Sequence, residues 1–362
     1  MLQLAAMTAA LLVAVLPPVS PTRPKTARLS RGPVWTSFET LKLNQAQVDV
    51  AKAELSQLSR AVAASSRKTD SARIVALLCS QKLRYANELL AVDFVTSAKM
   101  FEDCSSLEQA IEVSNAAGLK QLVWCEQQGQ MVTISVVDVI APAKSIKVEL
   151  ELSDGWLSRT SHAMQSILQA MNVQLSEEQL KQTPSVSPTA LGKWLEAYSL
   201  AASIVNAKDE AEQKTLCQQA AALCDEALAL DAGLIEAYVL KASCLDELGD
   251  EGGVKQTLRD GFSRRDASKI DALTNLELEA DYARFYKADI DSAFAGYEAM
   301  LESAPNSLLG AWGLIDILLT GDGVSRPLEA DLSEAGELAT MILAAHPHSA
   351  VAKVISDRVV NK

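Results

Sequence analysis

The sequence predicts an α+β N-terminal domain, a mixed β-sheet with helices on one face, followed by an all-α helical solenoid. Three strand-like runs lie close together between residues 121 and 152, and a helix–turn–helix pattern recurs from about residue 190 to the C-terminus. Residues 181–189 (KQTPSVSPT) have the Pro, Ser and Thr content of a linker. We therefore divide the 362 residues into an apolar segment with a linker (1–32), an α/β domain (33–180), a linker (181–189) and a helical domain (190–362).

The N-terminal residues 2–16 (LQLAAMTAALLVAVL) form an uncharged apolar run. The run is short for a membrane span and typical of the core of a signal peptide. We therefore expect an exported or periplasmic protein, whose membrane contact, if it stays anchored, is made only by residues 2–16. The alternative is a cytoplasmic protein with a hydrophobic N-terminal helix. A signal peptide carries its positive charge before the apolar core, but here no Lys or Arg precedes the run. Four basic residues follow it instead, which favours the alternative: Arg23, Lys25, Arg28 and Arg31.

The α/β domain is predicted element by element from the spacing of its apolar residues. Helical spacing and strand character alternate in its first half, which predicts in order a strand at 34–41, a helix at 45–66, a helix at 71–90, a strand at 92–97 and a helix at 106–117. The second half is a three-strand meander, with a turn at Gln128-Gly129, and a closing helix: strands 121–127, 130–140 and 144–152, then helix 158–171.

The helical domain is predicted from one clear unit, residues 235–266. Tyr238, Ala242 and Leu245 share one helical face, and Leu248-Gly249-Asp250 forms a turn in which Gly249 suits a left-handed C-cap and Asp250 can cap the next helix. Small and apolar residues then follow on the second helix, at Val254, Leu258 and Gly261. The next unit keeps this pattern, with Lys287-Ala288-Asp289 as its turn and Ala293, Tyr297 and Met300 on its second helix.

These units resemble the tetratricopeptide repeat family, whose period is about 34 residues, over roughly residues 190–362. The resemblance implies stacked helical hairpins whose first helices line a concave groove that binds peptides. The bland alternative is a helical bundle with accidental periodicity.

A second resemblance covers about residues 33–180. The succession of Ser106-Leu107-Glu108, residues 118–123 (GLKQLV), residues 132–139 and residues 173–179 (VQLSEEQ) is similar to the N-terminal domain of the translocation protein TolB and its relatives. This resemblance implies a small α/β module of the kind that precedes tetratricopeptide repeats in many bacterial chains.

Charge and cysteine content limit the partners. The net charge is −13, and from residue 190 onward 15 Lys and Arg stand against 29 Asp and Glu. Such an acidic chain is a poor match for nucleic acid, whose phosphates need a basic face. Most of the charge is expected on solvated helix faces.

The six cysteines form no CxxC pair, so we expect buried thiols, with disulfides as the alternative in an exported protein.

No catalytic or cofactor motif is present. The sequence has three histidines and lacks G-x-S-x-G, the P-loop and G-x-G-x-x-G. We therefore expect a protein that is not an enzyme, with no cofactor and no metal site.

The groove implied by the repeat family is the candidate site. By register, its lining comes from the first helix of three successive units, and both acidic and aromatic side chains contribute: Glu236, Val239, Ser243, Asp246, Leu278, Tyr282, Phe285, Tyr286, Trp312 and Asp316. We expect a basic or apolar segment of a protein partner there, anchored on Tyr282, Tyr286 and Trp312. For each aromatic residue, packing between repeats is the alternative.

The sequence thus favours a non-enzymatic scaffold or adaptor for protein–protein interactions, associated with a bacterial cell envelope. Partners would bind through the groove, the sheet edge or both. The alternative is a cytoplasmic regulatory subunit of a signalling system, whose α/β module senses a ligand or partners an enzyme.

Overall fold

The computed structural model describes most of the chain after residue 58. The described ranges are 59–65, 70–86, 89–92, 94–176, 179, 187–204, 207–268, 270–304, 307–320, 329–346 and 349–360. The apolar run 2–16, the linker 17–32, the strand predicted at 34–41 and most of the linker 181–189 lie outside them. Within these ranges, no helix combines the length and the apolar character needed to cross a membrane.

A mixed five-stranded sheet forms the N-terminal region. Its spatial order is β2-β1-β3-β4-β5, in which β1 pairs in parallel with β2 and β3, and the last three strands form an antiparallel meander. The strands are β1 (Ser59–Ser65), β2 (Leu89–Ala91), β3 (Gln121–Gln128), β4 (Met131–Asp138) and β5 (Ile146–Glu151). The predicted fold class is thereby confirmed for this region, and the meander lies where the sequence predicts it.

Helices cover both faces of the sheet, where the sequence predicts them on one. Successive strand residues point to opposite faces. Ala63 of β1 and Val123 of β3 therefore pack with α4 (Asp70–Leu83) and α7 (Trp156–Ala170), whereas Val62 and Trp124 pack on the other face. The helices on that other face are α5 (Phe94–Met100) and α6 (Leu107–Ala116).

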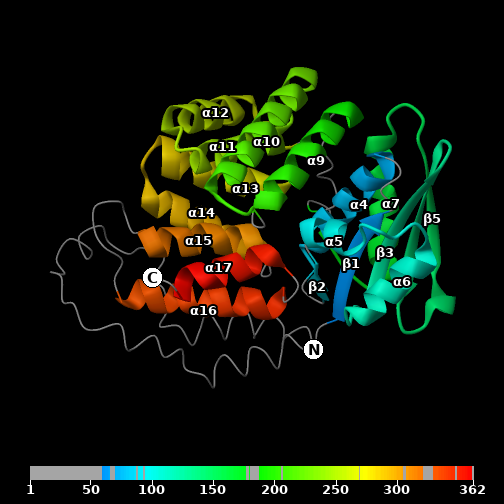
Figure 1. The fold of residues 1–362 in the computed structure, drawn as a ribbon. Coiled ribbons are helices and arrows are strands. Elements are labelled where there is room, and N and C mark those ends of the chain that lie inside the picture. Colours follow the sequence, from blue (N-terminus) through cyan, green and yellow to red (C-terminus); the bar gives the residue numbers. More distant parts are fainter. Residues whose placement is uncertain are drawn as a thin grey trace.

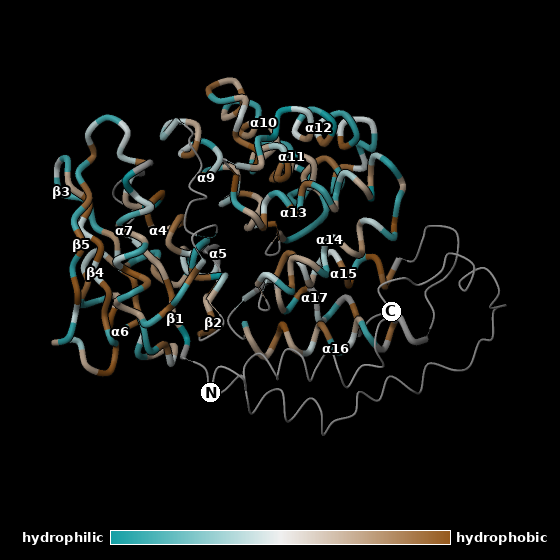
Figure 2. Tube along the Cα trace, turned by 180° about the vertical axis from the view of Figure 1, so that it is seen from behind, coloured by the Kyte–Doolittle hydropathy of each residue, from teal (hydrophilic) through white to brown (hydrophobic). Residues whose placement is uncertain are grey.

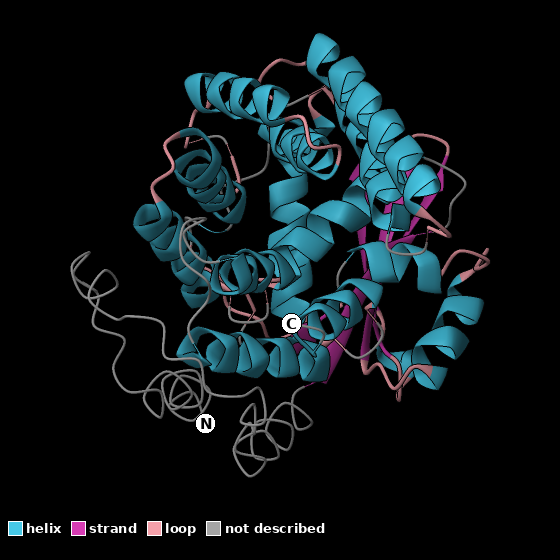
Figure 3. Ribbon diagram, turned by 60° about the vertical axis from the view of Figure 1, so that its left-hand side comes forward, coloured by secondary structure: helices cyan, strands magenta, loops and turns pink. Residues whose placement is uncertain are grey.

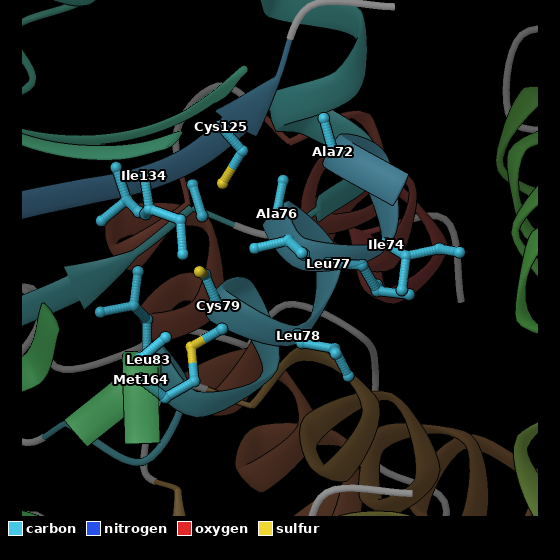
Figure 4. Packing of buried hydrophobic residues seen from close by; sticks show 14 of the residues in the cluster. Ala72, Ile74, Ala76, Leu77, Leu78, Cys79, Leu83, Cys125, Ile134 and Met164 are labelled. Atoms are coloured by element: carbon cyan, nitrogen blue, oxygen red, sulfur yellow. The ribbon is translucent and has the colours of Figure 1, made fainter. Parts of the chain in front are cut away.

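The core between α4, the sheet and α7 is packed with aliphatic side chains and two thiols. Cys79 of α4 and Cys125 of β3 both point into it, alongside Ile134 of β4 and Met164 of α7 (Figure 4). All six cysteines of the chain are buried and none forms a disulfide, which confirms the prediction of buried thiols.

The helix predicted at 45–66 is wrong at its C-terminal end, because residues 59–65 form β1. This strand lies between β2 and β3, and helices cover both of its faces, so Ala61, Val62, Ala63 and Ala64 are all buried. Small side chains at these four positions let both helical layers approach. A central strand of this kind does not alternate between apolar and polar residues. Without that pattern, its alanine content indicates a helix.

The strand predicted at 92–97 is also wrong. Residues 89–91 form the short strand β2, inside the segment predicted as the end of helix 71–90, and the chain then enters α5. The β-branched residues of α5 indicate a strand by propensity, but packing decides the outcome. The Ser97 hydroxyl donates to the Ala63 carbonyl of β1 at 2.5 Å, which fixes α5 across the sheet.

The region after residue 187 consists of helices arranged in successive hairpins. They follow an arc, which Figure 3 shows from another side, and its inner side faces α4 and α5 of the sheet region (Figure 1). The helices are α9 (Pro188–Ser203), α10 (Glu210–Leu230), α11 (Ile235–Glu247), α12 (Glu251–Arg264), α13 (Ala272–Asp281) continued by a π-helical turn (Tyr282–Tyr286), α14 (Ile290–Ser303), α15 (Leu308–Thr320), α16 (Glu329–Ala345) and α17 (Ala350–Val360). The predicted all-α region is confirmed.

Two hairpins share one turn geometry. Gly249 has φ 73°, and Ala288, at the equivalent place in the next hairpin, has φ 53°. Asp250 and Asp289 then accept hydrogen bonds from the backbone N–H groups of Gly253 and Ser292, and so cap α12 and α14. The turn predicted at Lys287-Ala288-Asp289 is therefore confirmed, with an alanine in the left-handed region that favours glycine.

The sheet and the helices share one continuous core. The cluster that begins on β1 and α4 extends through Trp194 of α9 and Cys224 of α10 to Ala237 of α11. Seen from behind, hydrophobic positions follow the strands and hydrophilic ones are frequent along α12 (Figure 2). The two regions of the sequence therefore form one packed unit.

Close helix contacts depend on glycines in the helix interiors. A Cβ on Gly313 of α15 would overlap the ring of Tyr297 on α14, which is buried and donates a hydrogen bond to Asp281. We predict that Gly313→Ala lowers the free energy of unfolding by about 1–3 kcal/mol, because an overpacked core shifts its neighbours. Urea denaturation measures this change.

Gly192 in α9 provides the matched control. A Cβ there meets no atom within 4 Å. We expect Gly192→Ala to stabilise the protein by up to about 1 kcal/mol, because alanine is the better helix former. A Gly313→Ala variant that was equally stabilised would contradict the tight packing of α14 on α15.

Candidate functional site on the inner face of the helical region

A cluster of carboxyl groups is the most unusual chemical feature of the helical region. Glu236 at the start of α11, Glu277 and Asp281 on α13 and Asp316 on α15 come from three successive hairpins. Arg284 forms an ion pair with Asp316, and the Tyr297 hydroxyl donates to Asp281. The remaining two carboxyl groups, on Glu236 and Glu277, have no ion pair and accept no hydrogen bond from another residue in the described ranges.

The pKa values of three of these carboxyl groups are raised. Burial raises the pKa of Glu236 to about 7 and that of Glu277 to about 8, and the neighbouring charges of Asp271 and Asp281 add to the two shifts. Burial also raises the pKa of Asp281 to about 6, with a further contribution from the charge of Asp246. Carboxyl groups that raise one another's pKa form one electrostatic site.

The sheet region supplies cations to this inner face. At the C-terminal end of α4, the Lys82 Nζ lies 3.4 Å and the Arg84 Nη2 3.6 Å from the carboxylate of Asp271. Asp271 caps α13 through the backbone N–H groups of Leu273 and Thr274, and is 1% exposed. The charge of Arg84 also lowers the pKa values of Glu236 and Glu277, against the effect of burial. The inner face is thus already a site for cationic side chains.

The residues predicted for the groove divide into three groups. Glu236 and Asp316 belong to the carboxyl cluster, and Asp246 adjoins it. Val239 and Leu278 are buried in the core between α11, α12 and α13, and Trp312 packs partly buried against the core of α15–α17. The other members are Ser243, exposed on α11, and Tyr282, Phe285 and Tyr286 of the π-helical turn, which also carries Arg284.

Two aromatic residues of the π-helical turn, Tyr282 and Tyr286, form a stack that begins on Phe262 of α12. The rings of Phe262 and Tyr282 lie 4.1 Å apart and those of Tyr282 and Tyr286 lie 4.7 Å apart, nearly parallel in both cases. Arg265 lies over Phe262 at 3.8 Å. Tyr282 and Tyr286 lie four residues apart, and residues at this spacing share one helix face, so their rings can stack. Packing between hairpins therefore explains Tyr282, whereas Tyr286 stays exposed.

Sequence reasoning missed half of the cluster. Glu277 and Asp281 lie four residues apart on α13, and Lys82 and Arg84 lie near the end of α4. The spacing of the two acids was a usable signal, since residues four apart share a helix face. Nothing in the sequence indicated that Lys82 would meet Asp271, a residue 189 positions later.

An open groove of ≈ 430 Å³ lies between α10, α11 and α12, away from the cluster. Its polar groups pair within the protein: Lys241 binds Asp225 at 2.6 Å, and Asp250 caps α12. Among the described residues, no three His, Cys, Asp or Glu side chains lie together so as to hold a metal ion. The groove thus offers a surface but no unpaired charge.

Comparison with known proteins gives no relative from which a function could be taken. No model of a protein family matches the chain, and no curated protein matches it either. The features that bear on function are therefore the mixed sheet region, the helical region and the carboxyl cluster where they meet.

Proposed function

We propose that this protein is a non-enzymatic scaffold that binds other proteins, and that the carboxyl cluster on its inner face binds a lysine- or arginine-bearing segment. The observation that carries the proposal is the pair Glu236 and Glu277, two carboxyl groups with raised pKa values that form no ion pair within the described residues. A cation brought by a partner would favour their ionised forms. Lys82, Arg84 and Arg284 support this, because each brings a cation to a neighbouring carboxylate.

The finer identity of the two regions is part of the same proposal. The shared turn geometry at Gly249 and Ala288 and the approach of Gly261 to Tyr238 support tetratricopeptide-type repeats. The helices α11, α13 and α15 begin at Ile235, Ala272 and Leu308, somewhat further apart than the family period of about 34 residues. We propose a diverged array of this type behind a small α/β module similar to the N-terminal domain of TolB.

The site of action follows from the N-terminal residues, which lie outside the described ranges. The apolar run 2–16 supports export, and we propose a periplasmic or envelope-associated protein. The cytoplasmic regulatory subunit is the alternative.

A peptide-binding experiment tests the proposed function. We expect the full chain to bind a lysine-rich peptide more tightly than a glutamate-rich peptide of equal length, as measured by fluorescence anisotropy. Glu277→Gln should weaken binding of the lysine-rich peptide about tenfold, because a partly buried charge pair is lost. Added salt should weaken it as well.

Glu251→Gln is the matched control. Glu251 is an exposed glutamate at the start of α12, remote from the cluster, and its variant should bind as the wild type does. Equal binding of the two peptides, or equal effects of the two substitutions, would contradict the proposal.

A further inference from the structure

The strand β5 forms an open edge of the sheet. The other edge strand, β2, has three residues, all of them buried, whereas β5 has six and lies at the rim of the molecule (Figure 1). Ile146, the first residue of β5, is 46% exposed, and Ile140 in the preceding loop is 74% exposed. Native proteins shorten, cover or charge their edge strands because unpaired backbone groups attract further strands.

The register of β5 determines which backbone groups are free to pair. The Leu152 N–H donates to the Gln130 carbonyl, and antiparallel strands alternate between residues that exchange hydrogen bonds and residues that do not. Ile146, Val148 and Leu150 therefore direct their N–H and C=O groups to β4, whereas Lys147 and Glu149 direct theirs away from the sheet. The carbonyl of Glu151 follows the same rule, since it accepts a hydrogen bond from Arg159 on α7.

The side chains of β5 alternate in the same way. Val148 and Leu150 face the core beneath α4 and α7, and Lys147 and Glu149 are on the opposite, exposed face. Neither Lys147 nor Glu149 forms an ion pair within the described residues. The strand thus presents one cation and one anion on either side of Val148, and the charge of Lys147 also contributes to the lowered pKa of Glu108 on α6.

We propose that β5 pairs antiparallel with β5 of a second copy of this chain, about a two-fold axis at Val148. In this register Lys147 lies opposite Glu149 of the second copy, and the same pair recurs across the axis. Both residues have outward-pointing backbone groups, so each pair also exchanges two backbone hydrogen bonds. On the core face, Leu150 of the second copy lies opposite Ile146 and covers its exposed side chain. The two sheets become one.

The charge pattern of β5 favours a second copy of the chain as the partner, and it favours this register over the neighbouring ones. A shift by two residues in one direction places Lys147 opposite itself, and a shift in the other direction places Glu149 opposite itself. Like charges directly opposite destabilise a strand pair, and opposite charges stabilise it. A strand whose sequence is complementary to its own reverse is therefore suited to a second copy of itself, and a two-fold interface uses the same surface on both chains.

Sedimentation velocity of the full chain tests the proposal. We expect the average mass to rise from that of a monomer towards twice that value between about 1 µM and about 100 µM protein, because an interface of this size is small. Lys147→Glu and Glu149→Lys should each weaken dimerisation about tenfold, because each creates two like-charge pairs. The double variant, with both substitutions in one chain, restores opposite charges and should dimerise again.

The controls are Lys255→Glu and Glu251→Lys on α12, which change the net charge equally but lie far from β5. They should dimerise as the wild type does. A chain that stays monomeric at every concentration would overturn the proposal. Unchanged dimerisation of the two single variants would overturn it as well. So would a double variant that does not dimerise.

Discussion

Substitution of Asp271 by alanine is expected to lower the free energy of unfolding by about 3–5 kcal/mol. Asp271 is the partner of two cations from the sheet region, Lys82 and Arg84, and Lys82 is itself buried. Removing the anion takes the carboxylate away from a buried ammonium, and a broken buried pair costs several times more than a surface pair. Urea denaturation followed by circular dichroism measures the change.

A control substitution at Asp209 distinguishes the contribution of the ion pair to stability from that of the helix cap. It caps α10 as Asp271 caps α13, by accepting a hydrogen bond from the Glu212 N–H, but it is exposed. Asp209→Ala should therefore cost about 1 kcal/mol, the usual value of a cap. If Asp271→Ala cost no more than this, the contact between α4 and α13 would contribute nothing beyond the cap.

A second substitution tests the same contact from its other side. Lys82→Met removes the buried ammonium and keeps an apolar stem. When it is added to Asp271→Ala, we expect it to recover at least about 1 kcal/mol, since coupled residues are not additive. A further loss in the double variant would show that Lys82 contributes by other contacts.

The helical half of the fold was predictable because its signals are local. The turn at Gly249, the cap at Asp250 and the alanine-sized contacts of the second helices all lie within one hairpin, so a single unit of sequence carries them. The first strand was not predictable in the same way. Ala61 to Ala64 become a strand only because β2, β3 and two layers of helices surround them, and of these neighbours only α4, which begins at Asp70, is close in sequence.

The candidate site was half predictable for the same reason. Glu236 and Asp316 could be placed on the inner face from the helical register alone. Their neighbours depend on how the hairpins stack and on where α4 ends, which fixes Arg84 beside Asp271. Helical register alone did not indicate that the Tyr282 ring stacks on Phe262 of α12, or that the Tyr286 ring stacks on Tyr282.

The unpaired carboxyl group of Glu236 is expected to make the protein less stable as the pH rises. Its pKa is about 7 in the folded protein and about 4.5 when exposed. Below about pH 4.5 the group is protonated in both states and contributes nothing. Between these two values the folded protein holds a proton that the unfolded chain has released, so stability falls with rising pH. Above about pH 7 the group is ionised in both states, and the free energy of unfolding falls no further through this group.

Glu236→Gln removes this titration. The charges of Asp271, Arg84 and Asp231, which also act on Glu236, remain in the variant. The difference in unfolding free energy between variant and wild type should therefore shift in favour of the variant by on the order of 2–3 kcal/mol between about pH 5 and about pH 8. Urea denaturation at the two pH values measures it. Glu251→Gln, whose side chain is 87% exposed, should show no such shift. A constant difference for Glu236→Gln would mean that a cation or water already compensates its charge, and Glu277 would then be the one unpaired carboxyl group left in the cluster.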